Sequence, residues 1–169
     1  MGPIWFRVIL ITVLVLEAAV WSDGYWDEER VALLQLQPLL SLRGFNWTEE
    51  KGSDCCEWEW VECNITTKQV TQLSLNNGLL WYLEFFNASL FLPFEELRSL
   101  DLSYNDLVGV GENEAHLKWL SKLGSLETLD LSETKMKNNL LLHLGGLSSL
   151  TTLKLEGNHL EGRIHLQGK

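Results

Sequence analysis

The chain has 169 residues, a hydrophobic fraction of 46% and a formal net charge of −10. These values are typical of a single globular domain and exclude a disordered chain. They also argue against nucleic acid or an anionic membrane surface as a partner, because both require a basic face.

Residues 1–22 are predicted to be a secretory signal peptide. A mainly apolar run of nine residues, Val8 to Leu16, follows the positive charge of Arg7, and small residues follow at Ala18, Ala19 and Ser22. A membrane anchor is the weaker alternative, since a spanning helix needs roughly 20 apolar residues. We therefore expect a secreted chain with no membrane span after the signal is removed.

Residues 23–66 are predicted to form an N-terminal helical cap. A short helix is expected from Glu28 to Gln37, with Val31 and Leu34 packed on the first repeat. It should end before Pro38, which lacks the N–H donor that continues a helix. Large aromatic side chains are expected to seal the open end of the core: Trp47, Trp58 and Trp60.

The export signal changes how the cysteines and asparagines of this region are interpreted. Cys55, Cys56 and Cys63 become disulfide candidates. Their odd number implies a free thiol, a shuffled bridge or an intermolecular bridge. Zinc binding is disfavoured, because no histidine stands at ligand spacing, and we expect neither a metal nor a cofactor. Three N-x-S/T sequons are candidate glycosylation sites: Asn46, Asn64 and Asn87.

The strongest signal is an internal repeat. The pattern L-x-x-L-x-L-x-x-N-x-L is complete over residues 97–107 and 150–160, and weaker copies cover 70–80 and 126–136. The copies start at 70, 97, 126 and 150, so the spacings are 27, 29 and 24 residues. An amphipathic helix is the alternative, but the L-x-L step would put two leucines on different helix faces. The pattern predicts a leucine-rich-repeat solenoid.

The predicted fold class is an α/β leucine-rich-repeat solenoid with about four repeats over residues 67–169. A short curved parallel β-sheet should form the concave side, with an irregular or helical convex side and helical turns at 116–120 and 138–144. We expect Gly78 and Thr134 to interrupt the asparagine ladder and loosen their coils. The C-terminus is expected to be uncapped, which would expose Leu153, Leu155 and Ile164.

A polar row on the concave side is the candidate binding surface. Concave solenoid sheets serve as extended binding surfaces, and a mixed, slightly acidic row with one aromatic suits a peptide or protein with some basic character. Ordinary solvated strand residues would give the same pattern. The expected exposed positions are Gln72, Ser74, Asn76, Asn77, Ser99, Asp101, Ser103, Tyr104, Thr128, Asp130, Ser132, Glu133, Thr152, Lys154, Glu156 and Gly157.

No catalytic constellation is recognisable in the sequence, so we expect no enzymatic activity. The sequence lacks a metalloprotease H-E-x-x-H, a nucleophile G-x-S-x-G and a P-loop. Asp101 and Asp130 fall at the same repeat offset and could suggest an acid/base pair. The same offset in successive repeats also produces a plain polar row, which is the favoured interpretation.

The repeat and the cap together resemble a known family. Residues 147–164 resemble the 24-residue plant-type repeat, and the next residue departs from it, because His165 stands where that family usually has proline. The block Glu28-Glu29-Arg30-Val31-Ala32-Leu33-Leu34, followed by Cys55-Cys56-Glu57-Trp58, resembles the cap of plant receptor-like proteins and kinases. The resemblance implies a Cys56–Cys63 bridge. It also implies that Tyr25 stands where the partner of Cys55 would be.

The resemblance implies an extracellular ligand-binding or protein-binding region of a receptor-like protein in plant signalling or defence, in truncated form. The expected partner is a peptide or protein ligand, with a co-receptor as a further candidate. The chain would then be secreted to the apoplast, or held at the cell surface if the full chain continues to a transmembrane helix. The alternatives are a secreted inhibitor of microbial wall-degrading enzymes and a non-functional gene fragment.

Overall fold

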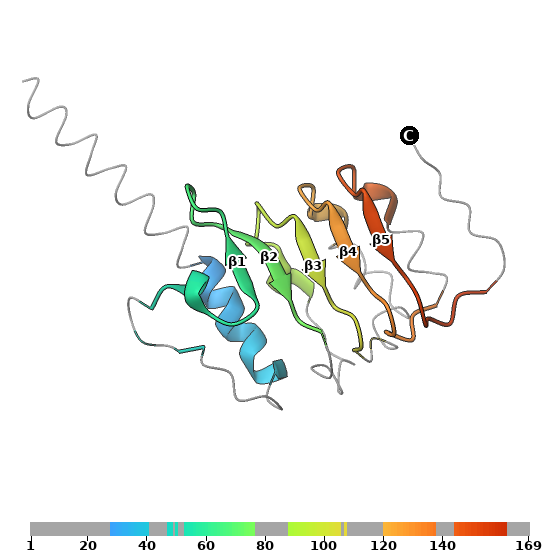
Figure 1. Ribbon diagram of the computed structural model, residues 1–169, viewed down its shortest axis with the longest axis horizontal. Coiled ribbons are helices and arrows are strands. Elements are labelled where there is room, and N and C mark those ends of the chain that lie inside the picture. The colour runs from blue at the N-terminus through green and yellow to red at the C-terminus, as the bar shows by residue number, and fades with distance from the viewer. Residues whose placement is uncertain are drawn as a thin grey trace, which may run out of the picture.

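The computed structural model describes residues 28–40, 47, 48, 50, 53–76, 88–105, 107, 120–137 and 144–161. In these residues the strands form one sheet in chain order (Figure 1). The pairing of β1 with β2 is antiparallel and all later pairings are parallel. The strands are β1 (Val61–Cys63), β2 (Val70–Ser74), β3 (Ser99–Asp101), β4 (Thr128–Asp130) and β5 (Thr152–Lys154).

One leucine of each repeat occupies the same place in the sheet. Leu73, Leu100 and Leu129 are paired across β2, β3 and β4, and all three are fully buried. Side chains alternate along a strand, so this register puts the residues on either side of each of these leucines on the opposite face. Leu153 and Leu155, expected to be exposed, are half-buried. The chain therefore forms a leucine-rich-repeat solenoid.

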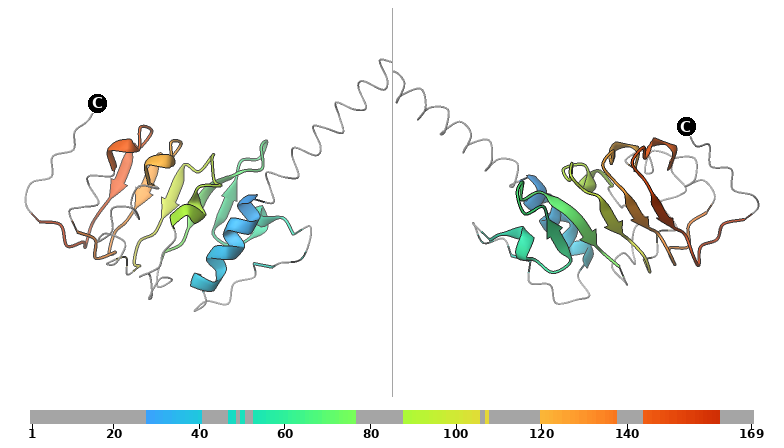
Figure 2. Two further views of the ribbon diagram at one scale, coloured as in Figure 1. Left: turned by 180° about the vertical axis from the view of Figure 1, so that it is seen from behind. Right: turned by 45° about the horizontal axis from the view of Figure 1, so that its top comes forward.

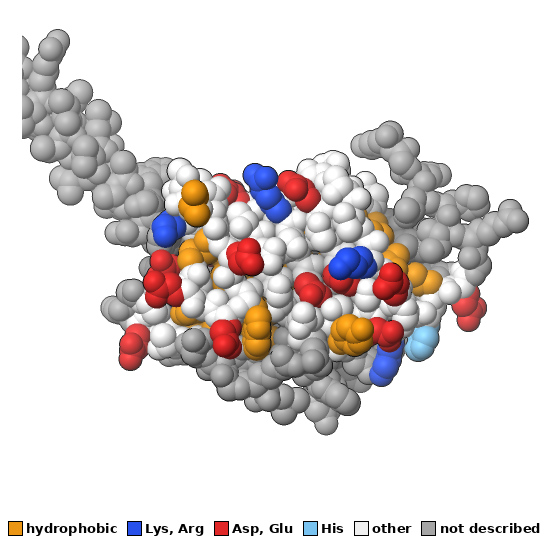
Figure 3. Space-filling model, viewed as in Figure 1, with side chains coloured by type: hydrophobic (Ala, Val, Ile, Leu, Met, Phe, Trp, Pro, Cys, Tyr) orange, Lys and Arg blue, Asp and Glu red, His pale blue; other side chains and the backbone are white. Residues whose placement is uncertain are grey.

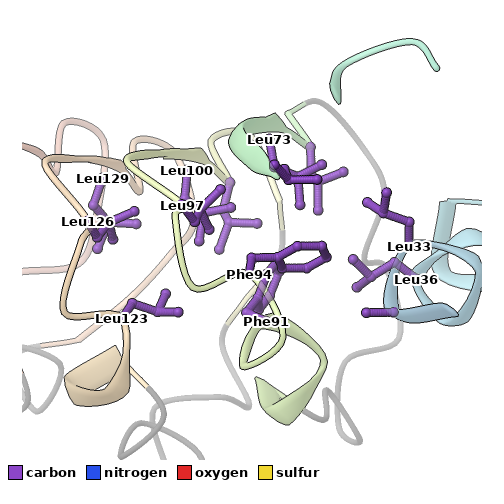
Figure 4. Close-up of a cluster of buried hydrophobic side chains, with 14 of the residues drawn as sticks. Leu33, Leu36, Leu73, Phe91, Phe94, Leu97, Leu100, Leu123, Leu126 and Leu129 are labelled. Atoms are coloured by element: carbon purple, nitrogen blue, oxygen red, sulfur yellow. The ribbon is translucent and has the colours of Figure 1, made fainter. Parts of the chain in front are cut away.

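Short 3-10 helices lie across the core from the strands (Figure 2). They are η4 (Ala88–Phe91), η6 (Leu120–Lys122) and η8 (Leu144–Gly146). Figure 4 shows Phe91, Phe94 and Leu123 directed from this side toward the leucines of the strands. The helical turns predicted at 116–120 and 138–144 are described only at their last residues, where η6 and η8 begin. Gly78 and Ile164 also lie outside the described residues.

The predicted cap helix is present, with Leu34 packed against the core as predicted and Val31 exposed, contrary to the prediction. Residues 28–36 are α-helical, and we call them the cap helix. Ala32, Leu33 and Leu36 are buried, whereas Val31 is 46% exposed and Leu34 is only partly buried. The α-helix ends at Leu36, before Pro38 as predicted. It tightens into the 3-10 helix η1 (Gln37–Leu40), a common way for an α-helix to end.

The region after the cap helix closes the end of the core. The rings of Trp47 and Trp58 are buried and stacked, with centroids 5.5 Å apart, while Trp60 is half-buried. Cys55 begins the 3-10 helix η2 (Cys55–Glu57) and is a buried free thiol. A disulfide joins Cys56 to Cys63 with an S–S length of 2.07 Å, the pairing that the family resemblance implies.

Asparagine side chains connect successive repeats. The side-chain amide of Asn105 donates to the carbonyl oxygens of Leu102 in its own repeat and Leu75 in the preceding one, at 2.9 and 2.8 Å. Thr134 was expected to interrupt this ladder. Thr134 is fully buried, and its hydroxyl lies 2.7 Å from the carbonyl oxygen of Leu131 in its own repeat. A hydroxyl has one hydrogen where an amide has two, so among the described residues no side-chain bond runs from Thr134 to the preceding repeat, and the ladder is interrupted here as predicted.

Candidate functional site: the polar face of the sheet

The outward side chains of β2 to β5 form one continuous surface, which we call the polar face. The strand register aligns them in two rows, Gln72–Ser99–Thr128–Thr152 and Ser74–Asp101–Asp130–Lys154. The described face also includes the exposed residues that follow the strands: Asn76, Tyr104, Glu133, Glu156 and Gly157. Figure 3 shows acidic side chains spread among uncharged polar groups over the strands. The structure thus brings together most of the residues expected from the repeat, while Asn77 lies outside the described residues.

Two predicted members of the surface are covered. Ser103 and Ser132 were expected to be exposed, but they are only 5% and 8% exposed. The backbone N–H groups of both serines donate to the aspartate two residues earlier, at 2.9 and 3.0 Å. The Ser103 hydroxyl also donates to Asp101, at 2.7 Å. These serines therefore hold the aspartates in place through hydrogen bonds, and a ligand on this face would not reach the serine side chains.

The aspartates differ in what their second oxygen accepts. Oδ2 of Asp101 accepts a 2.9 Å hydrogen bond from the side-chain amide of Asn76. Oδ2 of Asp130 accepts one of 2.9 Å from the ammonium group of Lys154. Burial raises the pKa of Asp130, but the hydrogen bonds from Lys154 and Ser132 outweigh burial and leave the pKa lowered. The ionised form of Asp130 is therefore favoured.

This geometry does not suit acid/base catalysis. A general acid needs a pKa raised toward neutrality, and Asp130 is shifted the other way. Near the cap, the side chains of Asp54, Cys55 and Cys56 come within 4.8 Å of one another, but their chemistry is poor for a metal. Cys56 is in the disulfide, and burial raises the pKa of the Cys55 thiol to about 11. A metal requires the thiolate.

A third row lies beyond the strand ends, where the backbone adopts positive φ. Tyr104, Glu133 and Gly157 have φ of 57°, 55° and 67°. The backbone N–H groups of Tyr104 and Glu133 donate to the carbonyl oxygens of Ser132 and Glu156 in the next repeat, at 2.9 and 2.7 Å. The carboxylate of Glu133 lies over Gly157, where a Cβ atom would overlap it. Sequence patterns did not indicate this contact.

Tyr104 is the aromatic residue of the polar face. Its side chain is 62% exposed, beside the carboxylate-bearing repeats of β3 and β4. Aromatic rings contribute large contact area for little loss of conformational freedom, and their faces attract cations. Tyr104 with Asp101, Asp130 and Glu133 is therefore suited to a ligand that carries basic side chains.

Of the predicted glycosylation sites, only Asn64 is in the described part of the chain; Asn46 and Asn87 lie outside it. Asn64 is in the turn between β1 and β2. Its Oδ1 accepts from the backbone N–H of Thr66, and its Nδ2 donates to Glu96 at 3.0 Å. The next residue, Ile65, is 91% exposed, so the sequon is at the surface.

Comparison with known proteins shows that this chain is similar to plant receptor-like proteins. The chain is 37% identical over 170 residues to Receptor-like protein 56 of Arabidopsis thaliana, in an alignment that covers 95% of this chain and 18% of the relative. It is 39% identical over 157 residues to Receptor-like protein 9a of the same plant, covering 90% and 17%. The chain thus spans less than a fifth of these relatives. No protein-family model matches it.

Among solved structures, the crystal structure of a plant ice-binding protein superposes with a TM-score of 0.60 at 23% identity. The match covers 79% of this chain and 41% of that one. It shows the solenoid fold and nothing about binding. In the described ranges, no helix is long and apolar enough to cross a membrane.

Proposed function

Because this chain is homologous to plant leucine-rich-repeat receptor-like proteins over nearly its whole length, we propose that it is an extracellular recognition region. Its polar face would bind a peptide or protein ligand with basic side chains, in signalling or defence. The chain would act by binding and not by catalysis. Residues 1–22 would serve as its signal peptide, with residues 23–66 as cap and 67–169 as repeats.

The observation that carries this proposal is the composition of the polar face. It combines one exposed aromatic ring, Tyr104, with the carboxylates of Asp101, Asp130, Glu133 and Glu156. Lys154 is the basic residue in the aligned rows, and Asp130 already pairs with it. Acidic surfaces steer basic partners, and complementary charge contributes more to specificity and association rate than to raw affinity.

A library of synthetic peptides sorted by net charge would test the proposal. The secreted chain would be immobilised and probed at low and at raised salt, because surface electrostatics are screened by salt. We expect bound peptides to be enriched in lysine and arginine. Asp101→Asn combined with Tyr104→Asn should weaken binding roughly 10-fold or more, the loss expected from one central anchor residue. Asn retains the turn acceptor at 101 and tolerates positive φ at 104.

Glu95→Gln is the matched control. Glu95 is an exposed acid in the segment before β3, outside the polar face, and its replacement removes the same unit of charge. It should leave peptide binding unchanged. Equal losses for the control and for the double variant would mean that only net charge matters. Enrichment of acidic peptides would overturn the proposal.

We also propose that Asn64 carries a glycan, as do Asn46 and Asn87. Thr66→Ala removes the middle sequon and leaves the asparagine in place to accept the turn hydrogen bond. Mass spectrometry of the secreted chain before and after enzymatic deglycosylation should show one glycan fewer in this variant. An unchanged glycan number would exclude Asn64 as an acceptor.

A further inference from the structure

Glu29 is a carboxylic acid buried where the cap helix meets the sheet. Its side chain is 2% exposed, and its Oε2 accepts a 2.9 Å hydrogen bond from the backbone N–H of Val70, the first residue of β2. Its Oε1 is also buried and has no hydrogen-bond partner among the described residues. Burying a charged carboxylate costs free energy unless hydrogen bonds or an opposite charge replace its contacts with water, so this site favours the neutral acid.

The acidic groups that face Glu29 from neighbouring elements also oppose its ionisation. Glu95 and Glu96, in the segment before β3, repel a negative charge at Glu29. Glu96 is itself fixed in place, because its Oε2 accepts hydrogen bonds from Asn64 and Thr67 in the turn between β1 and β2. From η2, the thiol of Cys55 faces Glu29 and remains neutral, since burial raises its pKa to about 11.

The nearest cation on the cap helix is directed elsewhere. The guanidinium group of Arg30 donates to the carbonyl oxygens of Thr48 and Glu50 and to the hydroxyl of Ser53. The other acid of this helix turn, Glu28, is exposed. In the described part of the chain, Glu29 thus has no ion pair to stabilise its charged form.

These surroundings fix the direction of the pH effect. Burial raises the pKa of Glu29 to about 7, with Glu96 and Glu95 adding to the rise and the hydrogen bond from Val70 opposing it. The ordinary value is 4.5. Between these two values the unfolded chain loses the proton while the folded chain keeps it. The contribution of Glu29 to the free energy of unfolding is therefore fully present below about pH 4.5 and is lost as the pH rises through about 7.

We propose that Glu29 is a pH-sensitive latch that holds the cap helix on β2 as a neutral acid and loosens this contact when it ionises. Ionisation would put an unpaired charge between the helix and the strand. The helix side chains Leu33 and Leu36 pack into the same core as Leu73 (Figure 4), so a loosened helix would open the N-terminal end of that core. The latch concerns the cap and is independent of ligand binding on the polar face.

Glu29→Gln tests the latch, because glutamine keeps the acceptor for Val70 and cannot ionise. Amide hydrogen exchange of the secreted chain would be followed by mass spectrometry over the cap helix and the start of β2. Wild type and variant would be compared at the same pH, so that the intrinsic pH dependence of exchange cancels. We expect equal protection near pH 5 and about 10-fold faster exchange of the wild type near pH 8.

Two further variants keep the test decisive. Glu28→Gln removes a charge from the exposed face of the same helix and should behave like the wild type. Glu96→Gln keeps an acceptor for Asn64 and Thr67 but removes the like charge, so the wild-type loosening near pH 8 should become smaller even if Glu29→Gln folds poorly. The latch is overturned if wild type and Glu29→Gln differ equally at both pH values, or if Glu96→Gln leaves the loosening unchanged.

Discussion

The ammonium group of Lys154 on β5 lies 2.9 Å from Oδ2 of Asp130 on β4. These residues are register partners in neighbouring strands, and the strand before them has Asp101 at the same position. The aligned row therefore changes from acid to base between one repeat and the next. The row is therefore acidic at Asp101 on β3 and neutralised across β4 and β5, where Asp130 and Lys154 pair.

The ion pair predicts how Asp130 titrates. In Lys154→Met the pKa of Asp130 should rise toward its ordinary value, because the main group that lowers it is gone. The ion pair stabilises the folded chain at pH values above the pKa that Asp130 has in the unfolded chain. This stabilisation is lost as the pH falls through the lowered pKa of the folded chain. The Lys154→Met variant should therefore lose less stability in acid than the wild type. Carboxyl NMR titration measures the pKa directly. An unchanged titration curve would show that Ser132 alone holds the value down.

The asparagine ladder predicts graded losses of stability. Asn105→Ala leaves the carbonyl oxygens of Leu75 and Leu102 without their donor, and should cost about 2–4 kcal/mol. Asn105→Thr should cost about half as much, since a hydroxyl can still serve the carbonyl of its own repeat, as Thr134 does. Urea unfolding gives both values. Asn76→Ala, at an exposed amide, is the control and should change little.

A side chain at position 157 is predicted to destabilise the fold. Its φ is +67° and a Cβ atom there would overlap the Glu133 carboxylate. Gly157→Ala should cost about 1–2 kcal/mol. Gly145→Ala is the matched control, because no atom lies within 4 Å of its Cβ position. Combining Gly157→Ala with Glu133→Ala should recover part of the loss. No recovery would assign the whole loss to the backbone conformation.

Cys55 is predicted to be an unreactive thiol in the folded chain. It is buried, and its pKa of about 11 leaves only about one thiol in a thousand ionised near pH 8. Iodoacetamide followed by mass spectrometry should therefore label one cysteine after denaturation and none before it. A label on Cys56 or Cys63 in place of Cys55 would mean that the bridge is shuffled, and a disulfide-linked dimer with no labelled cysteine would mean that Cys55 bridges between chains.

The repeat could be predicted from the sequence because its spacing directly encodes the register. Leucines at one fixed offset in each repeat must pair across the sheet, as Leu73, Leu100 and Leu129 do. The row of outward residues follows from the same alternation. Ser103 and Ser132 escape this rule because the next residue in each repeat has positive φ, which turns the chain and places each serine beneath its aspartate.

The cap could be located but not oriented from the sequence. Residues 31–34 are all apolar, so the pattern does not single out one helix face. The structure resolves the ambiguity by burying Ala32, Leu33 and Leu36 together with Glu29. A buried glutamate contradicts the usual preference of charged residues for the surface, which is why sequence reasoning overlooked it. Its partner, the backbone N–H of Val70, lies 41 residues away in the chain.

Site-directed photocrosslinking tests most directly whether the polar face binds ligand. A photoreactive phenylalanine analogue would replace Tyr104 or, as the control, Ser148, an exposed residue in the turn before β5. Each chain would be irradiated with the basic peptide that binds most tightly in the charge-sorted library. We expect the peptide to attach at position 104 and not at position 148. Attachment at 148 alone, or equally at both positions, would contradict this expectation.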